Sequence, residues 1–191
     1  MSEMTQNTPS HSIVITGGTS GIGLTIAKVL LGNPIYKVIL VGRDPDHIRD
    51  AKAELGAVKT FQDRYSFYEC DLADSKAISE LSHKITATHR DLYALVNNAG
   101  TYPFGGLETT DEAAWDHTFQ VNLKAAFLLT KQLTPAISRN NQGGRIINIS
   151  STAGILPNHF ALAYSVSKAA LIHLTKTLAK ELGRDSITVN C

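Results

Sequence analysis

Short apolar runs alternate along the chain with longer segments of helical periodicity. The runs are rich in β-branched residues and too short for helices, so they predict strands at 12–16, 37–41, 65–69, 92–96, 145–150 and 187–189. The segments between them predict helices at 22–31, 45–55, 75–88, 110–138 and 161–182. Repeated strand–helix units favour right-handed crossovers, and the pattern therefore predicts a doubly wound, Rossmann-type parallel sheet with strand order 3-2-1-4-5-6 and helices on both faces.

No linker, short repeat or low-complexity stretch interrupts this alternation, which indicates one dinucleotide-binding and catalytic domain over 13–191. The polar residues 1–12 predict a flexible leader, because they have neither the apolar core of a signal peptide nor an Arg-rich amphipathic pattern.

The charge balance argues against two classes of partner. Lys and Arg number 18 and Asp and Glu 17, a net charge of +1, so neither a nucleic-acid binder nor a membrane-surface protein is expected. No apolar run approaches the ~18 residues of a spanning helix. Two cysteines and seven histidines without ligand spacing predict no disulfide framework and no metal site. We therefore expect a cytoplasmic protein.

A glycine-rich loop, TGGTSGIG, joins the first strand to the first helix at 16–23. Gly17, Gly21 and Gly23 would let the backbone approach a pyrophosphate at the helix N-terminus. The spacing is not G-x-G-x-x-G, and Leu24 stands where a P-loop requires lysine, which excludes a kinase or NTPase. The loop favours nucleotide binding, with a plain glycine-rich turn as the alternative.

The residues after the second and third strands bear on the choice of nucleotide. Gly42 stands where a carboxylate would bind a ribose 2′-hydroxyl, and Arg43 follows it. A cation at this place favours the 2′-phosphate of NADP(H) over NAD(H), whereas Asp44 argues for the reverse. Asp71 could accept a hydrogen bond from an adenine amino group or cap the next helix, a role also open to Asp74 or Ser75.

Tyr164 and Lys168 lie four residues apart in a predicted helix, so both project from one face. A nearby ammonium favours an ionised phenol, so Tyr164 could protonate a carbonyl oxygen or deprotonate an alcohol. Ser151, at the end of the fifth predicted strand, could donate to the same oxygen. The alternatives are an ordinary Tyr–Lys pair and a capping serine. Asn122, among apolar residues of the long helix, indicates a buried hydrogen-bonding role or a satisfied core amide.

Taken together, these residues resemble the short-chain dehydrogenase/reductase family, in its compact single-domain branch. TGGTSGIG at 16–23, NNAG at 97–100 and YSVSK at 164–168 match the family patterns TGxxxGxG, NNAG and YxxxK. Ser151 precedes Tyr164 by thirteen residues, which is the family spacing.

The resemblance implies a catalytic role for four residues. Tyr164 would be the general acid and base, and Ser151 would position the substrate oxygen. Lys168 would hold the nicotinamide ribose and tune the phenol, while Asn122 would anchor a water that links Lys168 to bulk solvent. Residues 98–100 would support the central strand and touch the adenine ribose side. The implied cofactor-binding residues are Gly17, Thr19, Ser20, Gly21, Ile22, Gly23, Arg43, Asp71, Leu72, Asn98, Ala99, Gly100, Tyr164 and Lys168.

The expected function is that of an NADP(H)-dependent oxidoreductase that interconverts a carbonyl and an alcohol in a small-molecule substrate. Tyr102, Phe104, Leu156 and Phe160 suggest that this substrate is apolar rather than phosphorylated. The alternatives are a non-catalytic NADP-binding or interaction protein, and a dehydratase or epimerase without net redox change.

The resemblance also implies a homodimer or homotetramer formed through the helices 110–138 and 161–182. Family members continue past the sixth strand through a Pro-Gly turn, a substrate-covering segment and a seventh strand. We therefore expect the C-terminal end of the fold to be missing from these 191 residues.

Overall fold

The computed structural model describes residues 11–139 and 142–191. Residues 1–10 of the predicted leader lie outside the described residues. The last two residues assigned to the leader, His11 and Ser12, are instead buried in the first strand, so the leader boundary at residue 12 is wrong.

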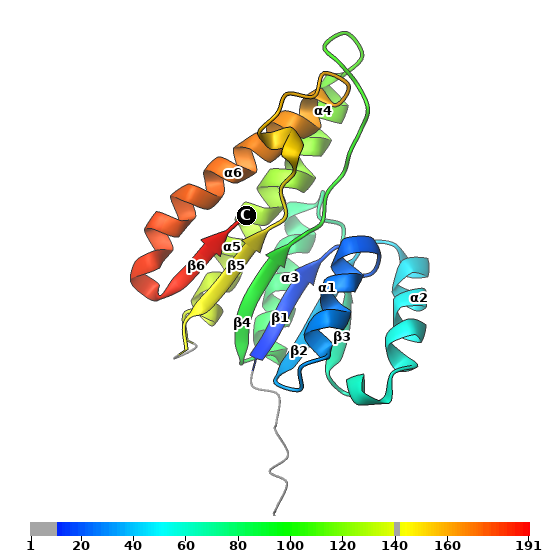
Figure 1. Ribbon diagram of the computed structural model, residues 1–191, viewed down its shortest axis with the longest axis vertical. Coiled ribbons are helices and arrows are strands. Elements are labelled where there is room, and N and C mark those ends of the chain that lie inside the picture. The colour runs from blue at the N-terminus through cyan, green and yellow to red at the C-terminus, as the bar shows by residue number, and fades with distance from the viewer. Residues whose placement is uncertain (1–10, 140–141) are drawn as a thin grey trace, which may run out of the picture.

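Six parallel strands form one sheet in the predicted order β3-β2-β1-β4-β5-β6 (Figure 1). The strands match the predicted ranges within one or two residues. They are β1 (His11–Thr16), β2 (Tyr36–Gly42), β3 (Tyr65–Glu69), β4 (Leu92–Asn97), β5 (Gly144–Asn148) and β6 (Ile187–Asn190).

The helices also follow the prediction, with one irregularity. They are α1 (Gly21–Leu31), α2 (Pro45–Gly56), α3 (Ser75–Thr88), α4 (Glu112–Phe119), α5 (Ala125–Ile137) and α6 (Leu162–Leu182). The helix predicted over 110–138 is α4 and α5 joined by a π-helical segment, Gln120–Lys124. Three short 3₁₀ helices lie in the connections, at Lys59–Phe61, Thr152–Gly154 and Gly183–Asp185.

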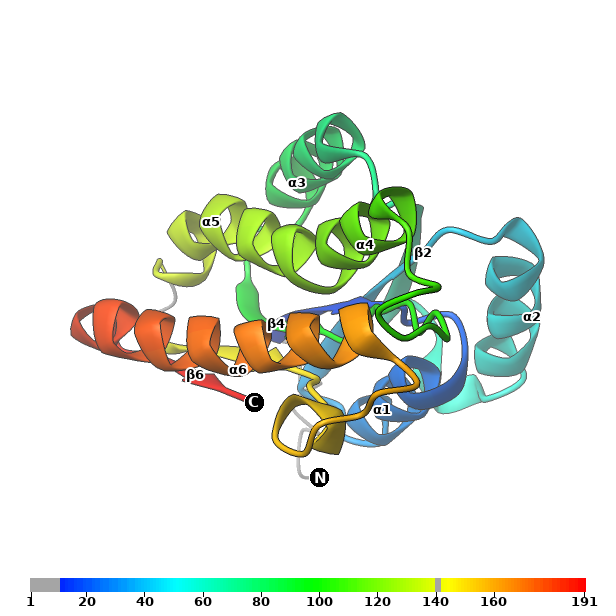
Figure 2. The ribbon, with the colours of Figure 1, turned by 90° about the horizontal axis from the view of Figure 1, so that it is seen from above.

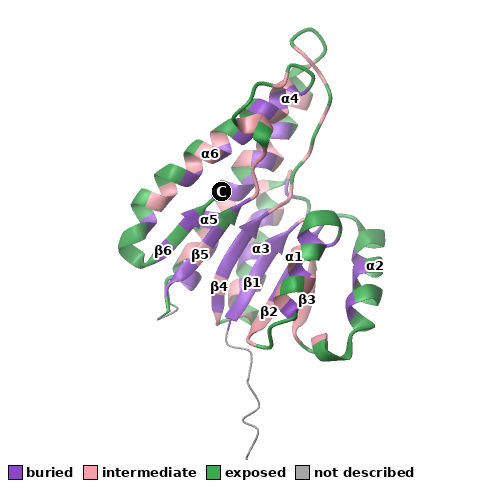
Figure 3. Ribbon diagram, viewed as in Figure 1, coloured by how far each residue is buried: buried purple, intermediate pink, exposed green. Residues whose placement is uncertain are grey.

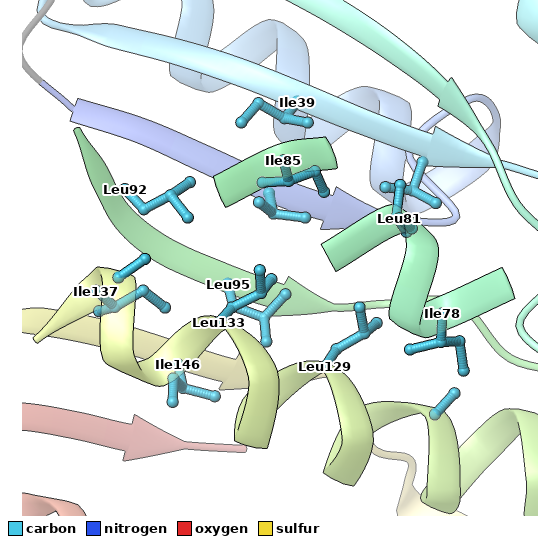
Figure 4. Packing of buried hydrophobic residues seen from close by; sticks show 14 of the residues in the cluster. Ile39, Ile78, Leu81, Ile85, Leu92, Leu95, Leu129, Leu133, Ile137 and Ile146 are labelled. Atoms are coloured by element: carbon cyan, nitrogen blue, oxygen red, sulfur yellow. The ribbon is translucent and has the colours of Figure 1, made fainter. Parts of the chain in front are cut away.

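The central strands of the sheet are covered on both sides by apolar helix faces, whereas one face of β5 and β6 is exposed. On one side, α3 and α5 pack against the central strands with Ile78, Leu129 and Leu133, as Figure 4 shows, and the end of α6 joins them through Leu182. On the other side, α1 and α2 cover β1, β2 and β4 (Figure 2). Burial of these side chains from both sides explains why the central strands read as continuous apolar runs.

The order of the strands reverses at β1 and β4, so the loops that follow these two strands diverge. Ligands of open α/β sheets bind in the crevice that this divergence leaves at the carboxyl ends of the strands. Figure 3 shows the loops above this edge largely exposed, while the strands beneath them are buried. Within the described ranges, no helix combines the length and apolar character needed to cross a membrane.

Candidate active site

A cleft of about 300 Å³ lies at the carboxyl ends of β1 to β4. Its lining brings together many of the residues predicted to bind a cofactor. These are Gly17, Thr19, Ser20, Arg43, Asp71, Leu72, Ala99 and Gly100. Gly21, Ile22 and Gly23 form the first turn of α1 and are not among the lining residues.

The glycine loop adopts a conformation that needs glycine at defined positions. Gly17 and Gly21 have φ values of +59° and +50°, which residues with a Cβ adopt at a cost. A Cβ on Gly23 would lie 2.2 Å from the carbonyl oxygen of Gly17, so the start of α1 packs directly on the loop. No side chain caps α1, and its first turn carries no acidic residue. The helix N-terminus can therefore offer N–H groups and its positive dipole end to an anion.

Asn98 fixes the glycine loop to the end of β4. Its Nδ2 donates to the carbonyl oxygens of Thr16 at 2.9 Å and Gly17 at 3.1 Å. Thr16 Oγ1 in turn accepts hydrogen bonds from the backbone N–H groups of Asn98 and Ala99, both at 3.0 Å. The side-chain amide of Asn98 thus supports the loop. Sequence reasoning missed Thr16, although a threonine directly before a glycine loop is a suitable acceptor for such contacts.

Arg43 and Asp44 lie next to each other at the end of β2, but their bonding differs. Within the described part of the chain, the Arg43 guanidinium makes no hydrogen bond or ion pair, and it lines the cleft. Asp44 is the N-cap of α2 and accepts from the N–H groups of Asp46 at 2.8 Å and His47 at 3.2 Å. These bonds, from His47 first and then Asp46, lower the pKa of Asp44. Both residues line the cleft; Asp44 caps α2 through Oδ1 alone, and the Arg43 guanidinium is available to a ligand.

The two roles considered for Asp71 are separated in the structure. Asp74 caps α3 by accepting from the N–H of Lys76 at 2.7 Å. Asp71 accepts from the N–H of Ala73 at 3.0 Å, is exposed and lines the cleft. Asp74 thus supplies the helix cap, and the Asp71 carboxylate can still accept a hydrogen bond from a ligand.

Lys168 is buried behind the wall of the cleft. Its side chain is 4% exposed, and its Nζ donates to the carbonyl oxygen of Ile149 at 2.7 Å. The same Nζ lies 5.7 Å from the centroid of the Tyr164 ring. A Cβ on Gly100 would be 3.6 Å from Nζ, which places the ammonium next to this cleft residue. Burial lowers the pKa of Lys168, since the cation loses hydration.

Ser151 does not end β5, because this strand stops at Asn148. The predicted strand end at Ser150 and Ser151 is therefore wrong. Ser151 is the N-cap of the short helix Thr152–Gly154, and its Oγ accepts from the N–H of Ala153 at 3.1 Å. Among the described residues its O–H has no acceptor, so this proton is available to a ligand. Ser150 Oγ instead donates to the carbonyl oxygen of Lys168 at 3.1 Å.

Asn122 lies in the π-helical segment, and its side chain is fully engaged as a donor. Nδ2 donates to the carbonyl oxygen of Thr101 at 2.9 Å and to Ser167 Oγ at 3.0 Å. Oδ1 accepts from the N–H of Thr101 at 2.7 Å. This side chain matches the alternative interpretation of a satisfied core amide. It joins the loop after β4 to α6, which carries Tyr164.

Sequence reasoning missed several residues that contribute to this region. Thr101, His117 and Val121 line the cleft, as does His47 in the first turn of α2. Tyr102, by contrast, was expected from the sequence to face the substrate, and its ring packs edge-to-face on Tyr164, with centroids 4.5 Å apart. His47 could have been identified from the sequence, because it follows Arg43 by four residues and therefore lies near the carboxyl edge of the sheet. The positions of Thr101, His117 and Val121 depend on how a long loop and an irregular helix fold, so no local pattern indicated them.

Comparison with known proteins gives a consistent result. Residues 11–191 match the family model described as short chain dehydrogenase. Nodulation protein G of Rhizobium sp. (strain N33) is 36% identical over 178 residues, which cover 93% of this chain and 69% of that protein. The rhamnolipids biosynthesis 3-oxoacyl-(acyl-carrier-protein) reductase of Pseudomonas aeruginosa is 35% identical over 181 residues, 93% of this chain and 69% of the reductase.

Solved structures include a metagenomic short-chain oxidoreductase in complex with NADP. It superposes with a TM-score of 0.85 at 36% identity, and the match covers 95% of this chain and 79% of that one.

Proposed function

Because the chain belongs to the short-chain dehydrogenase family, we propose that it is an NADP(H)-dependent oxidoreductase that interconverts a carbonyl and an alcohol. In this proposal, Tyr164 exchanges the proton of the substrate oxygen. The observation that carries it is the position of the buried Lys168 ammonium, 5.7 Å from the Tyr164 ring centroid and beside Gly100 in the cleft wall.

The donor groups of the cleft fit a nicotinamide dinucleotide. The glycine loop and the uncapped start of α1 would hold the pyrophosphate, and Asp71 would accept from the adenine amino group. Lys168 would hold the nicotinamide ribose, as the family resemblance implies. When bound, the nicotinamide supplies hydride to a carbonyl carbon or takes it from an alcohol carbon.

The residues around Tyr164 would then manage the proton and the charge on oxygen. In the reduction direction, the Tyr164 O–H bond breaks, its proton goes to the substrate oxygen, and a phenolate remains. The Lys168 cation, buried and 5.7 Å from the ring centroid, would favour this phenolate by its charge. Ser151 would donate its free O–H to the same oxygen and orient it. Oxidation of an alcohol reverses each transfer.

Two features support NADP(H) over NAD(H). Arg43 has an uncommitted guanidinium at the cleft, whereas the carboxylate of Asp44, which also lines the cleft, accepts through Oδ1 from two N–H groups of α2. In addition, the similar metagenomic oxidoreductase was solved with NADP. Arg43→Ala should weaken NADPH binding by about tenfold or more, the worth of a charge-assisted hydrogen bond, and leave NADH binding nearly unchanged. Equal losses for both dinucleotides would contradict this assignment.

The role of Tyr164 is tested by Tyr164→Phe, which keeps the ring and removes the acidic proton. Turnover of any carbonyl substrate should be abolished, while NADPH binding, followed by fluorescence, stays within about twofold. Tyr65→Phe, in β3, is the matched control and should keep its activity. An unchanged kcat in Tyr164→Phe would refute the proposed role. A protein that binds NADPH but reduces no member of a diketone, quinone and ketoacyl panel would be a non-catalytic binder.

We propose further that copies of the chain associate through α4, α5 and α6. Phe127 on α5 and Val166 on α6 are exposed apolar residues of these helices and support this interface. Sedimentation of wild type and of Phe127→Ser would test it, since loss of this contact should shift a dimer or tetramer toward monomer.

A further inference from the structure

Two loops next to Tyr164 expose an unusual amount of apolar surface. Phe104 is 81% exposed, and Tyr102, Leu156 and Phe160 are exposed as well. We call these four residues the apolar rim. They come from the segment after β4 and the segment before α6, which rise together above the carboxyl edge of the sheet in Figure 1. Exposed apolar groups that cluster in this way indicate a binding surface.

The two loops are fixed to each other and to α6. The N–H of Gly105 donates to the carbonyl oxygen of Phe160, and the N–H of Leu162 donates to that of Gly105, both at 2.9 Å. Leu162 is the first residue of α6, the helix that carries Tyr164. The root of the first loop is held by the bonds between Thr101 and Asn122. The apolar rim is therefore anchored to the elements that carry the proposed acid and base.

Aromatic contacts run from the solvent to Tyr164. The ring of Phe104 lies edge-on to Tyr102, with centroids 5.1 Å apart, and Tyr102 in turn packs on Tyr164 at 4.5 Å. The Tyr102 hydroxyl accepts from Asn158 Nδ2 at 3.3 Å, which fixes its orientation. A group attached to a carbonyl held at Tyr164 would lie close to the Tyr102 ring.

The charges of these loops limit what they can bind. Segments 101–110 and 152–161 contain no Lys or Arg; Glu108 is their one acidic residue and His159, whose ring centroid is 3.8 Å from that of Phe160, their one histidine. Lys168 is buried and bonded to the Ile149 carbonyl, so it cannot serve as a surface counter-ion. A substrate phosphate or carboxylate placed here would lose hydration without gaining a lysine or arginine partner.

We propose that Tyr102 and Phe104 bind the apolar, uncharged part of the substrate, so that the enzyme selects ketones and alcohols with aryl or alkyl groups over anionic ones. Tyr102 is the specificity-determining residue of this pair because it contacts both Phe104 and Tyr164. The inference rests on the proposed role of Tyr164, and it goes further by assigning the substrate class and the residues that recognise it.

A matched pair of ketones tests the proposal. Acetophenone and 4-acetylbenzoate share the reacting group and differ in one carboxylate, and 2,3-butanedione serves as a small reference substrate. With NADPH, wild type should show a kcat/KM at least about tenfold higher for acetophenone than for 4-acetylbenzoate. Equal values would overturn the inference even if all three compounds are reduced.

Tyr102 variants separate recognition from a structural role. Tyr102→Ala should raise KM for acetophenone about tenfold and leave KM for butanedione within about twofold, because only the larger ketone loses a ring contact. Tyr102→Phe keeps the ring and should retain the preference. A fall in kcat for both ketones with unchanged KM values would show that Tyr102 only supports Tyr164, and this would overturn the assignment.

Phe104→Ser serves as a second variant, since so exposed a side chain contributes little to folding, and it should weaken the preference for acetophenone. Val29→Ser, at an equally open apolar position on α1, is the matched control and should leave the preference unchanged. If Phe104→Ser changed the sedimentation of the protein instead of its kinetics, the apolar rim would be a contact between copies and the inference would be wrong.

The failure of the proposed function can be told apart from the failure of this inference. If wild type reduces neither these three ketones nor any member of the diketone, quinone and ketoacyl panel, the proposed activity is refuted, and ligand binding then tests the inference. Saturation-transfer NMR in the presence of NADP should detect acetophenone and not 4-acetylbenzoate, and Tyr102→Ala should abolish the acetophenone signal. Equal signals for the two ketones, or no effect of Tyr102→Ala, would overturn it.

Discussion

Replacing Lys168 with methionine, a side chain of similar length without charge, should make the free protein more stable and abolish turnover. Lys168 is 4% exposed, and the described residues provide its ammonium with one hydrogen bond, to the carbonyl oxygen of Ile149 at 2.7 Å. Within the described ranges, no carboxylate lies within ion-pair distance of it. The cation is therefore buried with little compensation.

Two opposing contributions determine the size of the effect. The variant loses a hydrogen bond to a charged group, worth about 1.5–3 kcal/mol. It also removes an ion whose burial costs several kcal/mol of hydration. We expect the second contribution to exceed the first by about 1 kcal/mol, which corresponds to a rise of about 2–4 °C in Tm for a chain of this size.

The pH dependence gives this prediction a second readout. Burial lowers the pKa of Lys168 below its ordinary value of 10.5, so the unfolded chain binds this proton more tightly than the folded protein. The charged lysine therefore destabilises the folded protein. This destabilisation has its full size below the folded-state pKa, and it disappears as the pH rises from that pKa toward 10.5. The stability of wild type should therefore approach that of Lys168→Met as the pH is raised.

Thermal unfolding of both proteins, without cofactor and from about pH 6 to about pH 10, measures this difference. Lys176→Met, on the exposed face of the same helix, is the control and should show a difference from wild type that does not change with pH. The reasoning is refuted if Lys168→Met unfolds at a lower temperature across the whole range, because the lysine would then be a structural anchor. Retained turnover in the variant would refute its proposed catalytic role.

Three further predictions concern the loop, the buried amide and the thiols. Gly23→Ala should lower dinucleotide affinity at least about tenfold because its Cβ would meet the loop backbone, whereas Gly183→Ala, whose Cβ would meet open space, should leave the affinity measured by titration unchanged. Asn122→Ala removes three hydrogen bonds and should cost about 2–3 kcal/mol in the free energy of unfolding, measured with urea; a cost under about 0.5 kcal/mol would show that this contact is dispensable. Burial raises the pKa of Cys70 to about 11, so a thiol reagent at about pH 8 should modify exposed Cys191 rapidly and Cys70 only on unfolding; two rapidly reacting thiols would contradict this.

Much of the fold could be predicted because each strand and helix carries its own pattern. The central strands are buried from both sides and appear as continuous apolar runs, while the helices between them have one apolar face. The glycine loop was predicted because its conformation depends on local residues, with Gly17 and Gly21 at positive φ. The strand order followed from the connections and from the family resemblance.

The parts that could not be predicted depend on contacts between distant segments. The π-helical segment Gln120–Lys124 interrupts a helix whose apolar pattern continues without a break, and the polar Asn122 indicated only a buried hydrogen-bonding role. The contact of Tyr102 with Tyr164 depends on the pairing of Gly105 with Ala161, which no local pattern encodes. The proposed roles of Ser151, Tyr164 and Lys168 remain predictions.

Side-chain amides hold the elements of the candidate site together, and this has a consequence for its response to pH. Asn97 Nδ2 donates to Asn148 Oδ1, and Asn148 Nδ2 donates to Thr175 Oγ1, both at 2.8 Å, so that β4, β5 and α6 are linked. Asn98 and Asn122 make the corresponding links to the glycine loop and to the loop after β4. Amides do not titrate, so this framework should keep its geometry across the range in which enzymes are assayed. A change of kcat with pH would then report the protonation of groups that take part in the reaction rather than a rearrangement of the site.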